Sequence, residues 1–99
     1  MTPKYERVVC KDGFSMSVQA HNGAYCHPRI DDAIEYTAVE VGYPSEEEPL
    51  LGRWVENPKY PTDTVYAYVP VSVIVDVLAK HGGVVSGEVP PGVIRLEAL

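Results

Sequence analysis

Residues 64–83, TVYAYVPVSVIVDVLAKHGG, decide the fold because two periodicities follow each other in them without a gap. From residue 65 to residue 69 branched or small apolar residues alternate with Tyr66 and Tyr68, the period of two of a β-strand. After Pro70 the spacing becomes helical, with apolar residues at Val71, Ile74, Val75 and Leu78. Pro70 suits a first helical turn and Gly82-Gly83 suits a helix end. The stretch therefore predicts a strand over 64–69 that leads directly into a helix over 71–81.

Three further segments are predicted to be strands. Segments 5–10 and 14–20 flank an Asp12-Gly13 turn, which is typical of a β-hairpin, and segment 36–43 ends at Pro44. Four prolines from Pro44 to Pro61 exclude a long regular element there. We therefore expect an α+β fold, a small antiparallel sheet of three or four strands with one C-terminal helix packed on one face. The expected core consists of Phe14, Met16, Val18, Val39, Val41, Val65, Val69, Ile74, Val75 and Leu78.

The chain divides into one α+β domain over 1–83 and an apolar tail over 84–99 that Pro90-Pro91-Gly92 interrupts. The helix also carries a second apolar stripe, Val73 and Val77, which one face of a small sheet does not cover easily. Two interpretations follow. The tail and the second stripe pack on another copy, which predicts a homodimer, or the tail covers the stripe within one chain.

The composition indicates a globular protein with a formal charge of −6, from eight Lys and Arg against fourteen Asp and Glu. That charge disfavours direct binding to nucleic acid or to an anionic membrane. No apolar run approaches the length of a membrane span and the first residues lack the pattern of a signal peptide, so we expect an intracellular protein with reduced Cys10 and Cys26. No cofactor is expected.

The segment 21–32 is the most chemically varied loop, and it contains His21, Cys26, His27 and Arg29. His21, Cys26 and His27 offer three metal ligands, but the paired spacing of a zinc site and a fourth ligand are missing, so we predict no metal. Cys26 beside His27 suggests a nucleophile with a base. Neighbouring residues in an extended segment point apart, however, so a base would have to come from His21 or His81.

An acidic turn and a surplus of tyrosines point to a binding surface. Glu46, Glu47 and Glu48 either form a solvated turn or imitate spaced phosphates toward a basic channel in another protein. The chain has seven Tyr against one Phe and one Trp, and Tyr is favoured where one side of a ring meets a partner. The candidate binding residues are Tyr25, Cys26, His27, Arg29, Glu46, Glu47, Glu48, Tyr66 and Tyr68; we predict no catalytic residue.

Four sequence segments are similar to those of a known family: DGFSMSVQA at 12–20, YCHPR at 25–29, VEVGYPS at 39–45 and TVYAYVP at 64–70. Together they resemble a family of short, mostly uncharacterised proteins encoded by bacteriophages and prophages. The similarity spans residues 7–83, leaves the tail outside and carries no catalytic motif. It implies a phage accessory protein in the cytoplasm of the bacterial host, a category that contains inhibitors of host enzymes and of host defence systems.

We therefore expect a small non-enzymatic phage protein that binds and modulates a host protein, for example as an inhibitor of a host defence system. One alternative is a small hydrolase or metal-dependent enzyme that uses the loop from His21 to Arg29. Another is a structural or self-assembling phage component, for which the apolar tail is the only support.

Overall fold

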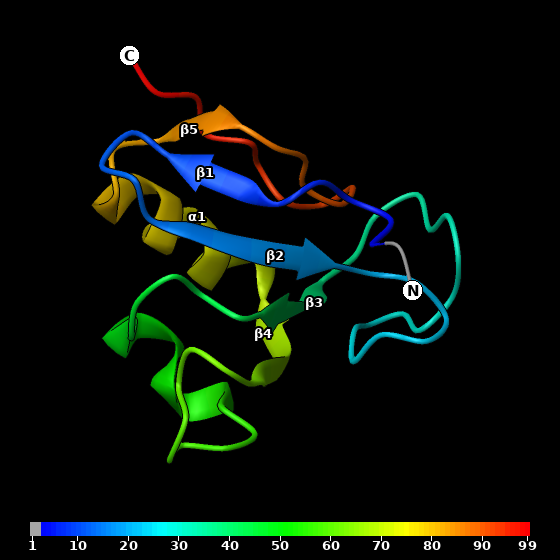
Figure 1. The fold of residues 1–99 in the computed structure, drawn as a ribbon. Helices are drawn as coiled ribbons and strands as arrows, with labels where there is room; N and C mark the ends of the chain where they lie inside the picture. Colours follow the sequence, from blue (N-terminus) through cyan, green and yellow to red (C-terminus); the bar gives the residue numbers. More distant parts are fainter. Residues whose placement is uncertain (1–2) are drawn as a thin grey trace.

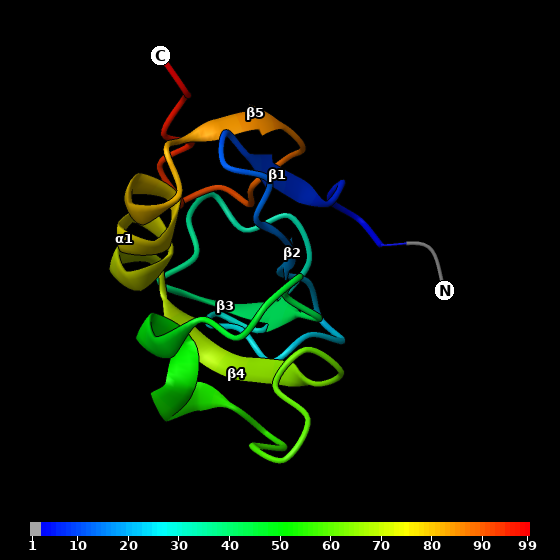
Figure 2. The same ribbon diagram turned by 60° about the vertical axis from the view of Figure 1, so that its left-hand side comes forward.

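A computed structural model describes residues 3–99, which form one antiparallel sheet with one α-helix on its face (Figures 1 and 2). The strand order is β4-β3-β2-β1-β5. The elements are β1 (Val8–Cys10), β2 (Ser15–Gln19), β3 (Ala38–Gly42), the 3₁₀ helix η1 (Pro49–Trp54), β4 (Val65–Pro70), α1 (Val71–Lys80) and β5 (Val84–Ser86). The predicted α+β class is confirmed, with five strands in place of three or four. Over the described residues, no helix has the length and hydrophobicity needed to cross a membrane.

The hairpin of β1 and β2 forms around the predicted Asp12-Gly13 turn. The Cys10 amide donates to the Phe14 carbonyl at 2.8 Å, and the Phe14 amide donates to the Asp12 carboxylate at 2.9 Å. Gly13 has φ +94°, a backbone conformation that glycine adopts at little cost. The turn therefore fixes the register in which Val8 faces Met16, and both side chains are fully buried.

Strand β4 contains a bulge that the alternation in the sequence does not reveal. Val41 pairs with Tyr66 but Val39 pairs with Val69, so a step of two residues on β3 faces a step of three on β4. The additional residue reverses the parity of the side chains, and Tyr66 and Val69 both lie in the core with at most 1% exposure. The prediction that Val65 lies in the core with Tyr66 opposite is therefore wrong; Val65 is half-buried.

Helix α1 begins after Pro70, as predicted, and ends one residue earlier, with His81 as its C-cap. Its buried stripe differs from the predicted one. Ile74, Val77 and Leu78 are completely buried, whereas Val75 is only half-buried. The predicted stripe and the observed one both have helical spacing, so periodicity alone could not choose between them. The observed stripe continues to His81, which is also buried.

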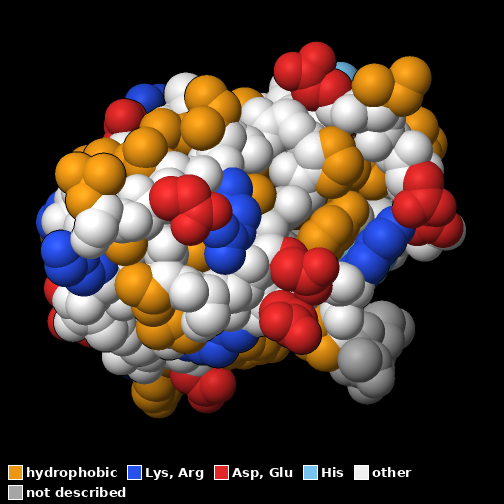
Figure 3. All heavy atoms as spheres, turned by 90° about the horizontal axis from the view of Figure 1, so that it is seen from above, with side chains coloured by type: hydrophobic (Ala, Val, Ile, Leu, Met, Phe, Trp, Pro, Cys, Tyr) orange, Lys and Arg blue, Asp and Glu red, His pale blue; other side chains and the backbone are white. Residues whose placement is uncertain are grey.

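Residues 84–99, the apolar tail of the sequence analysis, pack on the same body as the rest of the described chain. Strand β5 pairs with β1, and the chain then returns beside it, because the Val84 amide donates to the Leu96 carbonyl at 2.7 Å. The return passes so close to Gly83 that a Cβ there would lie 2.6 Å from the Ala98 nitrogen. The view in Figure 3 shows hydrophobic side chains at this end of the molecule, interspersed with charged ones.

Candidate interaction surface

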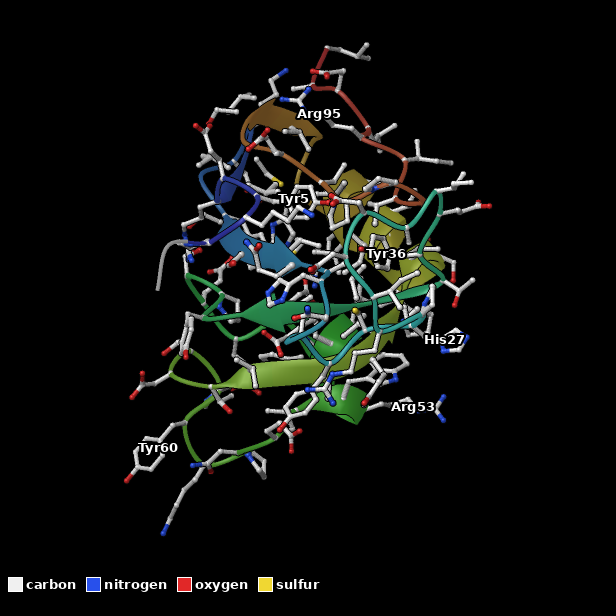
Figure 4. All side chains as sticks on the ribbon, turned by 90° about the vertical axis from the view of Figure 1, so that its right-hand side faces the viewer. Tyr5, His27, Tyr36, Arg53, Tyr60 and Arg95 are labelled. Atoms are coloured by element: carbon white, nitrogen blue, oxygen red, sulfur yellow. The ribbon has the colours of Figure 1, made fainter. Side chains whose placement is uncertain are left out.

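The loop over residues 21–37 lies at one end of the sheet and is held to it by backbone hydrogen bonds (Figure 1). The His27 amide donates to the Ala38 carbonyl at 3.0 Å, and the Tyr68 amide donates to the Tyr25 carbonyl at 3.0 Å. Tyr36 is completely buried and anchors the loop from within, because its hydroxyl donates to the Ile30 carbonyl at 2.7 Å (Figure 4). The loop therefore presents its exposed side chains from a fixed position.

Tyr25 and Tyr68 bring the loop and β4 together on the surface. Their ring centroids are 5.9 Å apart and the rings are tilted by 40°. They remain 39% and 46% exposed. The guanidinium of Arg29 lies 5.3 Å from the centroid of the Tyr25 ring, within the range of a cation–π contact. Three of the predicted binding residues thus form one cluster, which we call the tyrosine–arginine surface: Tyr25, Arg29 and Tyr68.

The bulge in β4 is what exposes Tyr68. This residue has φ +56°, in the left-handed region, which is unusual for a bulky side chain. Without the additional residue, the strand would direct position 68 to the same face as the buried Tyr66. Backbone strain of this kind persists only where the surrounding structure imposes it, and it is concentrated at functional sites. Asp32 and Tyr43 also have positive φ, and Tyr68 is the one of these three that belongs to the tyrosine–arginine surface.

Two more side chains project on this side of the molecule. His27 is exposed, and in Figure 4 it points away from the body on the same side as Arg53 of η1. Arg53 lies 5.6 Å from the ring centroid of Trp54. An antiparallel bridge between Val55 and Tyr66 joins the end of η1 to β4. Trp54 and Arg53, which the sequence did not indicate as binding residues, thus lie beside the strand that carries Tyr68.

Cys26 is a predicted binding residue that the structure places in the interior. It is 1% exposed, and its thiol donates to the carbonyls of His21 at 3.3 Å and Pro28 at 3.5 Å. Burial raises the pKa of this thiol above its ordinary value, which leaves it protonated and weakly nucleophilic. Cys26 therefore supports the fold of the loop, and its assignment to a binding surface is corrected.

Glu48 and Tyr66 are also corrected from surface to interior residues. Tyr66 is 1% exposed and its hydroxyl donates to the Pro61 carbonyl at 2.6 Å. Glu48 is 2% exposed, whereas Glu46 and Glu47 are exposed as predicted for a solvated turn. Glu48 and Tyr66 line a pocket of about 140 Å³ beside Pro61, which is smaller than the usual site for a drug-sized ligand. Of the three consecutive glutamates, Glu46 and Glu47 therefore face solvent and Glu48 lies in the interior.

Glu48 belongs to a charged cluster that the sequence did not indicate, in which buried Glu48 and His81 meet the half-exposed side chains of Asp12 and Lys80. The Nδ1 of His81 donates to Asp12 at 2.6 Å, and its Nε2 donates to Glu48 at 2.8 Å. Lys80 Nζ lies 2.8 Å from one oxygen of Glu48 and 3.1 Å from the other. The imidazole stacks on the Phe14 ring with centroids 4.1 Å apart. The cluster joins the β1–β2 turn, η1 and the end of α1.

The protonation states of the cluster follow from these contacts. Burial lowers the pKa of His81, but the hydrogen bonds to Asp12 and Glu48 outweigh it, so the pKa is raised above 6.5. Burial raises the pKa of Glu48, yet Lys80, the Leu50 amide and His81 together bring it below its ordinary value. Both imidazole nitrogens donate only in the imidazolium form. With both nitrogens engaged, His81 stabilises the fold and has no free nitrogen to act as a base.

Within residues 3–99, no group of three or more His, Cys, Asp and Glu side chains is arranged to hold a metal ion. Comparisons with protein-family models, with curated proteins and with solved structures found no match for this chain. The chain's own residues and their arrangement are therefore the basis for a function.

Proposed function

We propose that this chain is a non-enzymatic binding protein that contacts a partner protein through the tyrosine–arginine surface. The observation that carries the proposal is the exposed pair of Tyr25 and Tyr68, with ring centroids 5.9 Å apart and Arg29 over one ring. Tyr and Arg are among the residues that contribute most of the binding energy at protein interfaces. Their side chains here come from a well-anchored loop and a bulged strand, so little conformational entropy is lost on binding.

The enzyme alternative has less support from the same loop. A nucleophile at Cys26 would need an accessible thiolate, and this thiol is buried with a raised pKa. His81, the other candidate base, donates through both nitrogens to carboxylates. The remaining histidines, His21 and His27, lie on the loop without a carboxylate to orient them among the described residues.

The resemblance to bacteriophage and prophage proteins supplies the proposed setting. In that setting the partner is a host protein in the bacterial cytoplasm, and binding modulates it, for example by inhibiting a host defence system. The charge of −6 supports a protein partner over direct binding to nucleic acid.

Capture from a lysate of the bacterial host tests this function. Three tagged baits are compared: the wild type, the double variant Tyr25→Ala with Tyr68→Ala, and the matched control Tyr60→Ala. Tyr60 is 58% exposed and lies far from His27 in Figure 4. We expect a host protein that is retained by the wild type and the control, is lost with the double variant, and binds again when both proteins are purified. Equal capture by all three baits would refute the proposed surface.

A homodimer remains a separate proposal with a narrower basis. Val77, one of the two residues of the second helical stripe, is completely buried within the chain, so it needs no second copy. The exposed apolar side chains of β5 and the returning segment are Val85, Ile94, Leu96 and Leu99. Light scattering at micromolar concentration is expected to give the mass of two chains, and a Val85→Ser, Ile94→Ser variant is expected to give the mass of one. One chain for the wild type at all concentrations would rule the dimer out.

A further inference from the structure

We propose that the tyrosine–arginine surface receives a carboxylate-bearing segment of the partner protein, with Arg29 as its charged anchor. This inference deepens the binding function proposed above and rests on it. It assigns an acidic contact to a chain whose overall charge of −6 would favour a basic one.

Most Lys and Arg side chains already have oxygen acceptors within the chain. Ion pairs join Lys4 to Asp32, Lys80 to Glu48 and Arg95 to Glu97, while Arg7 donates to the Tyr43 carbonyl and Lys11 to the Leu99 carbonyl. Arg29 is different. Its Nε donates to the Asn22 carbonyl at 3.2 Å, and its two outer nitrogens make no hydrogen bond within residues 3–99. The two N–H groups that form a bidentate pair with a carboxylate are therefore available.

The carboxylates next to Arg29 are engaged elsewhere. Asp31 accepts from the backbone amide of Asn22 at 3.0 Å and from its side-chain amide at 3.1 Å. Glu40 accepts from the Tyr25 amide at 3.1 Å. Both acids thus hold the loop in place, and neither makes an ion pair with Arg29. Arg29 therefore has N–H groups that can donate to an external carboxylate.

The position of the Arg29 side chain is already fixed. Its Nε hydrogen bond and its contact with the Tyr25 ring hold the guanidinium plane, so less rotamer entropy is lost when an acid binds. Tyr25 and Tyr68 provide an apolar flank for the residues next to that acid. Arg53 also lies on an aromatic ring and makes no ion pair among the described residues, and in Figure 4 it projects on the same side of the molecule as His27 of the loop. The geometry fits an acidic side chain flanked by apolar neighbours.

A protein carboxylate fits better than a phosphate chain because of the charge of the whole molecule. A polyphosphate backbone brings a charge with every nucleotide to a protein that carries −6, and the repulsion acts over about 10 Å at ordinary salt. One or two carboxylates at Arg29 gain the local attraction and avoid most of that repulsion.

The first test is an NMR titration of the isotope-labelled protein with four probes: acetyl-Glu-Leu-Glu-Leu-Glu-amide, its Lys counterpart, inorganic phosphate and a twelve-residue oligothymidylate. We expect the acidic peptide alone to shift the amide signals of Tyr25, Arg29 and Tyr68. The Arg29→Gln variant should bind this peptide about tenfold more weakly or worse, as for a lost charge-assisted contact. Arg95→Gln, which removes an internally paired arginine, should leave the titration unchanged. Shifts caused by the Lys peptide, the phosphate or the oligonucleotide in place of the acidic peptide would overturn the inference, as would no shift at all.

The second test separates this inference from the proposed function. Once a partner is purified, its affinity is measured for wild type, Tyr25→Ala, Arg29→Gln and Arg29→Lys. We expect losses in the first two variants, and partial recovery with lysine, which keeps the charge but not the planar pair of donors. A loss with Tyr25→Ala and none with Arg29→Gln would preserve the binding function and overturn the acidic contact. No loss with Tyr25→Ala would overturn the binding surface itself.

Discussion

The charged cluster and the tyrosine–arginine surface both combine charged and aromatic side chains. They differ in whether their charged groups have hydrogen-bond partners within the chain. In the cluster, His81 donates to Asp12 and Glu48, and Lys80 adds a second cation to Glu48. At the surface, the outer nitrogens of Arg29 have no acceptor within the described chain. Glu48 and His81 are buried at the centre of the cluster, whereas Tyr25 at the surface is 39% exposed.

The difference between the two regions assigns different tasks to them. A buried ion network contributes little net stability over an apolar core, but removing one member leaves the others unpaired at a large cost. An exposed arginine on an aromatic ring has little effect on the free energy of folding. It contributes to the free energy of binding when a partner supplies the acceptor. Substitutions in the cluster should therefore change folding, and substitutions at the surface should change binding.

The largest effect on the free energy of unfolding is expected for Glu48→Ala. Glu48 accepts from Lys80, His81 and the Leu50 amide, and its side chain is 1% exposed. Its loss should lower the free energy of unfolding by about 3–5 kcal/mol, as for other broken buried ion pairs. Urea unfolding at pH 6 measures it, with Glu47→Ala as the matched exposed control, expected to change stability by about 0.5 kcal/mol or less. Equal effects of the two substitutions would contradict the buried position of Glu48 and its contacts with Lys80 and His81.

The pH dependence of stability is the next largest effect. Because the folded pKa of His81 is raised, the folded chain holds its proton longer than the unfolded chain, and stability should fall as the pH rises from 6.5 through that pKa. The pKa values of Asp12 and Glu48 are lowered, so stability should also fall as the pH drops below about 4. Maximum stability is expected between pH 4.5 and 6.5.

Urea unfolding over pH 3 to 9 measures this profile. The His81→Gln variant should lack the decline on the alkaline side, because its titrating group is gone. A wild type whose stability rises between pH 6.5 and 8 would mean that His81 is neutral in the folded protein, against the hydrogen bonds described here.

A smaller effect on stability is expected for Tyr68→Gly. Glycine accepts the φ of +56° without the cost of about 1–2 kcal/mol that a side chain incurs, but it increases the entropy of the unfolded chain. The two terms nearly cancel, so stability should change by less than about 1 kcal/mol while partner binding is lost. Tyr66→Gly, at a completely buried position, should instead lower stability by several kcal/mol, about the cost of a deleted core aromatic. Thermal unfolding of both variants measures the contrast.

Local signals in the sequence were sufficient for the hairpin at Asp12-Gly13 and for the helix after Pro70, because each depends on residues close together in the chain. The cluster could not be predicted, since His81 is 69 positions from Asp12 and 33 from Glu48, and only the order of the strands brings them together. The bulge at Tyr68 reversed the expected sides of Val65 and Tyr66, because it depends on pairing with β3.

For the interaction surface, the sequence identified the members Tyr25, Arg29 and Tyr68 from their residue types and their loop. It did not predict that Tyr25 and Tyr68 meet, because that contact requires the loop to bond to β4. It also grouped Cys26 and Glu48 with them. Both residues are polar and lie outside the strands. Nothing near them in the chain shows that they find hydrogen-bond partners in the interior.

The central claim is that the exposed pair binds a partner and contributes little to folding, and a paired measurement on Tyr25→Ala tests it most directly. The affinity for the captured partner and the free energy of unfolding are measured on the same preparations of wild type, Tyr25→Ala and the control Tyr60→Ala. We expect Tyr25→Ala to weaken binding about 30-fold, as for an interface residue that contributes about 2 kcal/mol, and to change unfolding by about 0.5 kcal/mol or less. Tyr60→Ala should change neither. Unchanged partner affinity in a folded Tyr25→Ala variant would contradict the proposed binding role of Tyr25 and Tyr68.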